Sequence, residues 1–149
     1  MHKILSSKFI FHSLPYFFKK ILFRHFKKSQ FKRDVFLINN IDKNDYSFKG
    51  FFKTRSVFIH IPKCAGISVN KSIYGNLGGG HRNFLYYEFF FGKEFIDKCF
   101  TFTIVRNPYE RFLSAFNYLK NHGMNNSDKS FAINHVTNYF DINDFILHE

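Results

Sequence analysis

The chain has 149 residues, of which 45% are hydrophobic and 21% aromatic, and its formal net charge is +11. This length suits one domain with a hydrophobic core, and so aromatic a composition argues against a disordered chain. The two cysteines are too few for a disulfide framework and are not spaced as a zinc site, which predicts a reducing, cytoplasmic setting.

Most of the charge lies at the N-terminus, where residues 1 to 33 hold nine Lys or Arg and no acid. Aromatic and basic residues alternate in FIFHSLPYFFKKILFRHF, but polar residues and Pro15 interrupt the apolar runs. Neither a membrane-spanning helix nor a signal peptide is therefore expected. We expect a helical extension that packs on the body by its phenylalanines. The alternatives are peripheral contact with an anionic membrane, and hence membrane association, or contact with nucleic acid.

The stretch at residues 39 to 50, NNIDKNDYSFKG, is polar and turn-rich, which predicts a linker. Residues 1–50 are accordingly expected to form the basic, aromatic-rich extension and its linker, and residues 51–149 the folded body. Because the charges of residues 1 to 33 lie outside the motifs described below, we expect that segment to be dispensable for ligand binding.

Two strand-loop-helix units are predicted in the body. β-Branched and aromatic residues indicate central strands at 57–61 and 101–105, followed by helices over 67–74 and 109–120, and Gly123 lies just past the second helix. Between the units we expect a flexible turn at residues 76–80, NLGGG, and a helix over 82–91 that stops at Gly92. This order predicts an α/β fold with a parallel sheet.

The first unit, VFIHIPKCAGISV, has the layout of an anion-binding loop. A buried strand that runs into a tight loop and a helix brings backbone N–H groups together. Lys63 adds a positive charge, Ala65 and Gly66 allow close approach, and Ser68 offers a hydroxyl. The loop is not the GxxxxGK[ST] type, because its lysine precedes the glycine. A strand-to-helix turn with an incidental lysine is the other reading of this stretch.

The second unit, VRNPYERFLSAF, places Arg106 at a strand end, with Arg111 and Ser114 on one face of the next helix. Arginine presents a planar fork suited to phosphate oxygens, and a hydroxyl adds a further hydrogen bond. Two anion sites on neighbouring loops indicate a ligand with two separated anionic groups.

Together the two motifs resemble those of a known family. HIPKCAGIS is similar to the 5′-phosphosulfate loop, and RNPYERFLSAF to the 3′-phosphate motif, of sulfotransferases that use 3′-phosphoadenosine 5′-phosphosulfate (PAPS). The nearest branch is that of carbohydrate, heparan-sulfate-like sulfotransferases and their bacterial relatives. The resemblance covers residues 57 to 147 and implies a P-loop-like sheet with flanking helices, PAPS as co-substrate, a carbohydrate hydroxyl as acceptor, and no metal.

The resemblance also implies roles for individual residues. The phosphosulfate loop comprises Lys63, Cys64, Ala65, Gly66, Ile67 and Ser68, with Cys64 and Ile67 where the family often has threonine. Arg106 and Ser114 match the 3′-phosphate site. Arg111 matches the second arginine of the motif, or is a structural partner of a carboxylate.

His81 resembles the family histidine that accepts the acceptor's proton, so Lys63 and His81 are the catalytic candidates. A surface histidine in a flexible turn is the other reading, with Glu88 and Glu94 as alternative bases, while His60 is expected to pack in the core. In the family, further elements follow the terminal NYFDINDFILHE, so residues 51–149 are expected to be the N-terminal part of such a nucleotide-binding domain, incomplete at its C-terminus.

Two rival functions remain open. Cys64 could be a nucleophile whose pKa is lowered at a helix N-terminus. The chain could instead be a basic module that binds nucleic acid or a membrane surface without catalysis. Both rivals leave the second motif unexplained, and no specific nucleic-acid partner is expected.

Overall fold

The computed structural model describes residues 13 to 38 and 45 to 148, which fall into two compact units. The first unit combines the described residues up to His60 with Ile67–Thr103, and the second combines Ile61–Gly66 with the described residues from Ile104 onward. Each unit is described by itself below.

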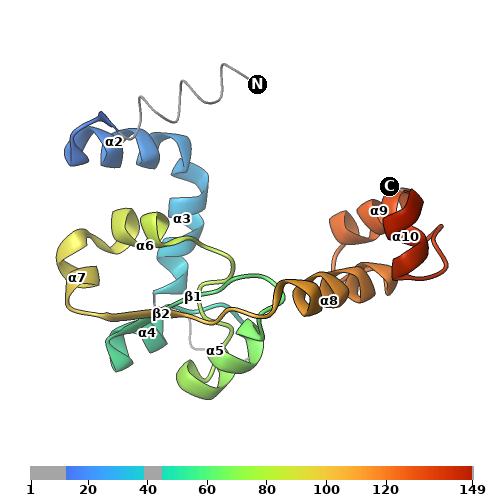
Figure 1. Cartoon of the computed structure of the whole chain (residues 1–149). Coiled ribbons are helices and arrows are strands. Elements are labelled where there is room, and N and C mark those ends of the chain that lie inside the picture. The colour runs from blue at the N-terminus through green and yellow to red at the C-terminus, as the bar shows by residue number, and fades with distance from the viewer. Residues whose placement is uncertain (1–12, 39–44, 149) are drawn as a thin grey trace. The chain divides into compact units, whose positions relative to one another are not determined.

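A small parallel sheet lies in the first unit (Figure 1). Strand β1 (Ser56–Ile59) pairs with β2 (Phe100–Thr103), in a register that sets Ser56 opposite Phe100 and Ile59 opposite Thr103. The two predicted strands and their parallel pairing are confirmed. The sheet in the described residues has only these two strands, so neither is central as predicted. Both strands end two residues before the predicted ends, at Ile59 and Thr103.

Helices make up most of the remaining described chain, and three of them confirm the helices that the sequence predicts. These three are α5 (Gly66–Tyr74), α6 (Phe84–Phe91) and α8 (Pro108–Lys120). The others are α2 (Tyr16–Phe26), α3 (Lys28–Leu37), α4 (Lys49–Thr54), α7 (Lys93–Asp97), α9 (Asn126–His135) and α10 (Ile142–His148).

Local chemistry fixes the ends of α6. The Asn83 side chain accepts a hydrogen bond from the backbone N–H of Tyr86 at 2.8 Å, which caps the first turn. Gly92 follows the last turn with a φ of 94°, a conformation that other residues adopt only with strain. The predicted stop at Gly92 is therefore confirmed.

The core of the first unit is mainly aromatic. Its fully or nearly fully buried members are Phe48, Phe51, Val57, Tyr86, Tyr87 and Ile96. Phe48 falls in the stretch predicted as a linker, yet its ring lies 5.6 Å from that of Phe51 and 6.1 Å from that of Tyr87. The described part of that stretch is therefore not a fully exposed linker, because the ring of Phe48 is buried in the aromatic core although its neighbours in sequence are polar.

Helices α2 and α3 pack on α6, as expected for a helical extension that docks by its phenylalanines (Figure 1). The ring of Phe23 lies 6.0 Å from Tyr86 and 5.0 Å from Phe89, and that of Phe31 lies 5.1 Å from Tyr86. These rings extend the aromatic core to the N-terminal helices.

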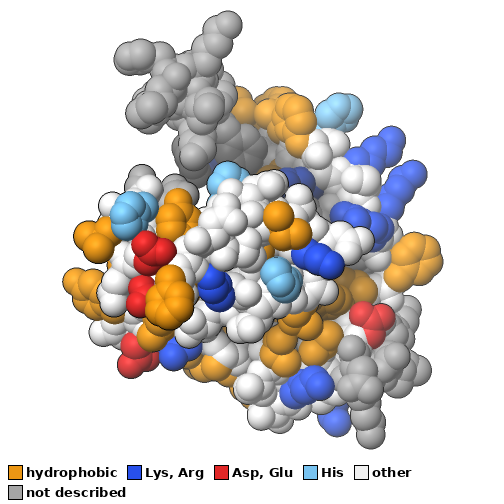
Figure 2. All heavy atoms as spheres, turned by 90° about the vertical axis from the view of Figure 1, so that its right-hand side faces the viewer, with side chains coloured by type: hydrophobic (Ala, Val, Ile, Leu, Met, Phe, Trp, Pro, Cys, Tyr) orange, Lys and Arg blue, Asp and Glu red, His pale blue; other side chains and the backbone are white. Residues whose placement is uncertain are grey.

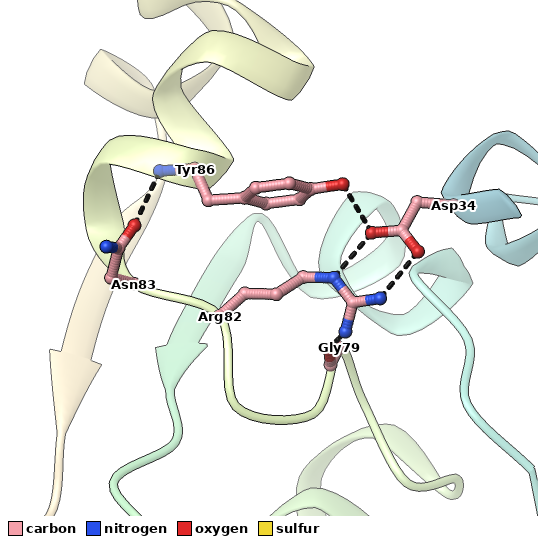
Figure 3. Close-up of polar contacts among 5 residues, drawn as sticks. All are labelled: Asp34, Gly79, Arg82, Asn83 and Tyr86. Carbon is pink, nitrogen blue, oxygen red and sulfur yellow. Dashed lines mark hydrogen bonds and ion pairs between the residues drawn. The ribbon is translucent and has the colours of Figure 1, made fainter. Parts of the chain in front are cut away.

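A buried polar network ties α3 to the segment before α6 (Figure 3). Arg82 donates hydrogen bonds to both carboxylate oxygens of Asp34, each at 2.5 Å, and Tyr86 donates its hydroxyl to the same carboxylate. Arg82 also donates to the carbonyl oxygen of Gly79. Asp34 is 2% exposed, and its negative charge is compensated by the guanidinium of Arg82.

The second unit has its own small core on α8, α9 and α10. Phe116, Ala132 and Val136 are buried, and the ring of Phe145 lies 5.6 Å from that of Phe116. The Lys120 ammonium donates to the carbonyl oxygens of Thr137, at 3.1 Å, and of Tyr139.

The surface mixes basic and hydrophobic side chains, as one face shows in Figure 2. Among the described residues, no helix is both long enough and apolar enough to span a bilayer.

Candidate functional site

The loop at Ile61–Gly66 is tight and strained. Lys63 and Ala65 have φ angles of 66° and 58°, in the left-handed region that favours glycine. The backbone N–H of Cys64 donates to the carbonyl oxygen of Ile61 at 3.3 Å, which closes the turn. Left-handed residues that alternate with ordinary ones direct successive N–H groups to one side, an arrangement that binds anions.

The ammonium of Lys63 lies over an aromatic ring of α8. Its Nζ atom is 4.0 Å from the ring centroid of Tyr118, close enough for a cation–π interaction. Burial lowers the pKa of Lys63, the positive charge of Arg106 lowers it further, and the carboxylate of Asp128 raises it. Lys63 and Arg106 therefore form a positive, partly desolvated pair whose repulsion an anion would relieve.

Tyr118 and Asp128 support this lysine. The Tyr118 hydroxyl donates to a carboxylate oxygen of Asp128 at 2.5 Å, and the backbone N–H of Met124 donates to the Tyr118 hydroxyl oxygen at 3.0 Å. Neither residue was predicted from the sequence. Helical spacing would have placed Tyr118 on the same face as Ser114, because it lies one turn later on α8. No signal in the sequence pointed to Asp128.

Arg111 holds the loop against α8. Its Nε donates to the carbonyl oxygen of Pro62 at 2.9 Å. The sequence left open whether Arg111 binds ligand or pairs with a carboxylate, and the contact seen is with a backbone carbonyl. This bond positions the residue directly before Lys63.

Arg106 lies before α8 and forms an ion pair with Glu110, with Nε 3.2 Å from the carboxylate oxygen. The Arg106 side chain is 43% exposed, and exposed pairs of this kind contribute at most about 1 kcal/mol. An anionic ligand can therefore displace Glu110. Ser114, half-buried one turn after Arg111, has no hydrogen-bond partner for its hydroxyl among the residues that the structure describes.

The remaining members of the predicted phosphosulfate loop differ in exposure. Cys64 is 2% exposed, so its thiol is not placed to attack a substrate. Gly66 is also buried, whereas Ile67 and Ser68 are exposed in the first turn of α5. The first turn of α5 contains no acidic residue.

His81 belongs to the first unit and lies against His60, with 4.4 Å between the ring centroids. Burial, and to a smaller extent the neighbouring His81, lower the pKa of His60 to about 4. Burial also lowers the pKa of His81, which keeps its imidazole neutral and able to accept a proton near pH 7. His60 stacks on Phe58 at 5.8 Å, the packing that the sequence predicts for it.

The predicted site residues thus fall into two groups. Lys63, Cys64, Ala65, Gly66, Arg106 and Ser114 lie in the second unit, and Ile67, Ser68 and His81 in the first. No group of His, Cys, Asp or Glu side chains in residues 13 to 38 and 45 to 148 is arranged to hold a metal ion. The predicted loop residues offer backbone donors and cations between a strand and a helix of an α/β protein, a combination suited to an anion.

A model of the Sulfotransferase family matches residues 17–148, and the chain belongs to this family. The resemblance to sulfotransferases is confirmed at the level of the family, and the small parallel sheet with its helices is consistent with a fold of this type. The match begins at residue 17 rather than 57, so it includes α2 and α3. No curated protein and no solved structure matches the chain.

Proposed function

We propose that the protein transfers a sulfuryl group from PAPS to a hydroxyl group of a carbohydrate. Membership of the family supports sulfuryl transfer. The observation that carries the choice of an anionic donor is the loop at Ile61–Gly66, where burial and then the charge of Arg106 lower the pKa of Lys63, and where Lys63 and Ala65 have left-handed φ angles. The carbohydrate acceptor rests on the resemblance of the two motifs to the carbohydrate branch.

The loop supplies the cradle for the 5′-phosphosulfate. The donors are the Lys63 ammonium and backbone N–H groups of the loop and of the first turn of α5, apart from that of Cys64, which donates to Ile61, in a P-loop-like arrangement. Arg106, released from Glu110, and the Ser114 hydroxyl bind the 3′-phosphate. Arg111 and Tyr118 are positioning residues, because one contacts the carbonyl before Lys63 and the other lies under its ammonium.

The chemistry is an in-line displacement at sulfur. The acceptor oxygen forms a bond to sulfur while the bond between sulfur and the phosphate oxygen breaks, and adenosine 3′,5′-bisphosphate leaves. Negative charge grows on the leaving phosphate, where Lys63 stabilises it. The resemblance to the family makes His81, whose imidazole is neutral, the candidate that accepts the proton of the acceptor hydroxyl.

Replacing Arg106 tests the 3′-phosphate site. Arg106→Ala removes a charge-assisted contact of roughly 1.5 to 3 kcal/mol, so PAPS affinity falls about tenfold to a hundredfold. ATP lacks a 3′-phosphate, so its binding stays the same. Isothermal titration with both nucleotides measures the difference, and Arg33→Ala, at an exposed position of α3, is the control. Equal losses for PAPS and ATP would reject the assignment.

Replacing Lys63 tests the chemical step. Lys63→Ala lowers kcat more than it weakens PAPS binding, because the lysine charge is needed most as the leaving group develops. Cys64→Ala retains transfer, since the thiol is buried. Transfer of labelled sulfate from PAPS to a panel of glycans is the assay. A nucleic-acid-binding module would show neither nucleotide selectivity nor transfer.

A further inference from the structure

Helix α2 has two groups of apolar residues, one packed against α6 and one exposed. On its inner side, Tyr16 and Phe23 pack against Phe89, with ring centroids 5.4 and 5.0 Å apart. On the opposite side, Phe18, Leu22 and Phe26 follow one another at intervals of four residues. Phe17 and Ile21 flank this row. These five residues, the outer face of α2, have exposed fractions of 66% (Phe17), 55% (Phe18), 49% (Ile21), 37% (Leu22) and 79% (Phe26).

Basic residues border the outer face. Lys19 and Lys20 are half-buried at the edge of the inner side, one turn from Phe23 and from Tyr16 respectively, and Arg24 is exposed. The described stretch from 13 to 38 contains seven bases, Lys19, Lys20, Arg24, Lys27, Lys28, Lys32 and Arg33. Its one acid, Asp34, is buried and paired with Arg82. The positive charge at the surface of this segment is therefore not offset by an acid of its own.

We propose that α2 binds an anionic lipid surface and lies in the plane of the interface. The outer face enters the region between head groups and acyl chains, while Lys19, Lys20 and Arg24 reach the lipid phosphates with their flexible side chains. The helix has 11 residues and is about 16 Å long, half of what crossing the hydrocarbon core requires. Binding is therefore peripheral.

Charge and shape favour lipid over other occupants. A second copy seated on the same face would bring two strongly basic segments together, and their repulsion opposes a dimer. Nucleic acid matches the charge, and its bases can stack on phenylalanine, but it offers no apolar phase to the aliphatic Ile21 and Leu22 of the face. An anionic bilayer provides both an apolar phase and negative charge.

A tryptophan reporter tests insertion in the full chain. The chain contains no tryptophan, so Phe18→Trp introduces a single fluorophore on the outer face. The control is Phe140→Trp, because Phe140 is 88% exposed but lies in the second unit. With vesicles containing phosphatidylserine, we expect a blue shift and quenching by brominated lipid for Phe18→Trp alone. Equal responses from both variants, or no response from Phe18→Trp, would overturn the proposal.

Co-sedimentation separates the contributions of the two kinds of side chain. We expect two variants to partition onto phosphatidylserine vesicles about tenfold less or weaker still. One is the apolar double variant, Phe18→Ser with Phe26→Ser. The other is the charge variant, Lys19→Gln with Lys20→Gln and Arg24→Gln. Phe140→Ser and a triple charge control at exposed lysines, Lys53→Gln with Lys71→Gln and Lys129→Gln, leave it unchanged. Circular dichroism checks that the variants keep the native helix content and melting temperature.

Three results would contradict binding to an anionic lipid surface. The first is equal partitioning of the unaltered chain onto pure phosphatidylcholine vesicles, which would remove the role of charge. The second is nucleic-acid binding that exceeds vesicle binding and survives Phe18→Ser with Phe26→Ser. The third is a dimer in sedimentation velocity that this double variant abolishes.

Discussion

The carboxylate of Asp34 accepts three hydrogen bonds within the first unit, two from Arg82 and one from Tyr86 (Figure 3). Burial and the hydrogen bond to Asp34 both raise the pKa of Tyr86, so its hydroxyl remains a donor at all physiological pH values. Because the Arg82 side chain is 17% exposed, loss of the acid would leave a poorly solvated cation. Breaking this network by removing one partner is therefore expected to lower the free energy of unfolding by more than the intact network adds to it.

Asp34→Ala should lower the free energy of unfolding by about 3 kcal/mol or more, because Arg82 loses its buried counterion. Asp97→Ala is the matched control, since Asp97 pairs with Lys93 at 3.0 Å in an exposed i,i+4 pair and should change stability by less than about 0.5 kcal/mol. Urea unfolding of both variants provides the comparison. Similar losses in the two would show that Asp34 is not energetically distinct.

At the scale of elements, α2 and α3 contribute to the core of the first unit. Phe23 and Phe31 pack against the buried cluster, and α3 carries Asp34. The sequence analysis expected residues 1 to 33 to be dispensable for ligand binding, since their charges lie outside both motifs. The described part of this segment stabilises the first unit through its packing, a role that its charge pattern does not reveal.

A chain that starts at Asn44 lacks both helices and should be strongly destabilised. It loses the packing of Phe23 and Phe31, each contributing about 1.5 to 3 kcal/mol if fully buried, and it leaves Arg82 without Asp34. A chain that starts at Lys27 keeps α3, so its melting temperature should lie between those of the Asn44 chain and the full chain. Differential scanning calorimetry measures all three chains. A melting temperature for the Asn44 chain within about 2 °C of the full chain would contradict this role.

At the scale of the whole molecule, one titration couples stability to pH. The pKa of His60 is about 4 in the folded chain against 6.5 for an ordinary histidine, because burial and then His81 disfavour its charged form. Below pH 6.5 the unfolded chain takes up a proton that the folded chain does not. The stability due to neutral His60 is present above pH 6.5 and is lost as the pH falls toward 4.

His60→Gln should flatten the decline in unfolding free energy between pH 6.5 and about 4, because the substituted side chain does not titrate. His135→Gln, at an exposed position of α9, is the control and should leave that part of the slope due to His60 in place. Urea unfolding at a series of pH values gives the slope for each chain. A decline as steep in His60→Gln as in the unaltered chain would contradict the assignment.

Local pattern was enough to predict both strands, the helices α5, α6 and α8, and the family. Strand residues alternate or cluster by type, helix ends carry Asn and Gly, and the loop motif occupies consecutive positions, so each signal lies within about 15 residues of sequence. Lys63 was found as a candidate for the same reason. The roles of Arg106, Ser114 and His81 were inferred from resemblance and stay predictions.

Tertiary structure alone decided which residues support the loop and which hold the N-terminal helices. Tyr118 lies under Lys63, and Arg111 reaches Pro62, only because α8 packs beside a loop some fifty residues earlier in the chain. The pairing of Asp34 with Arg82 spans a separation of 48 residues. Short-range periodicity records which side of an element is apolar, but it does not record which distant side chain will meet it, because that depends on how all the connecting segments fold.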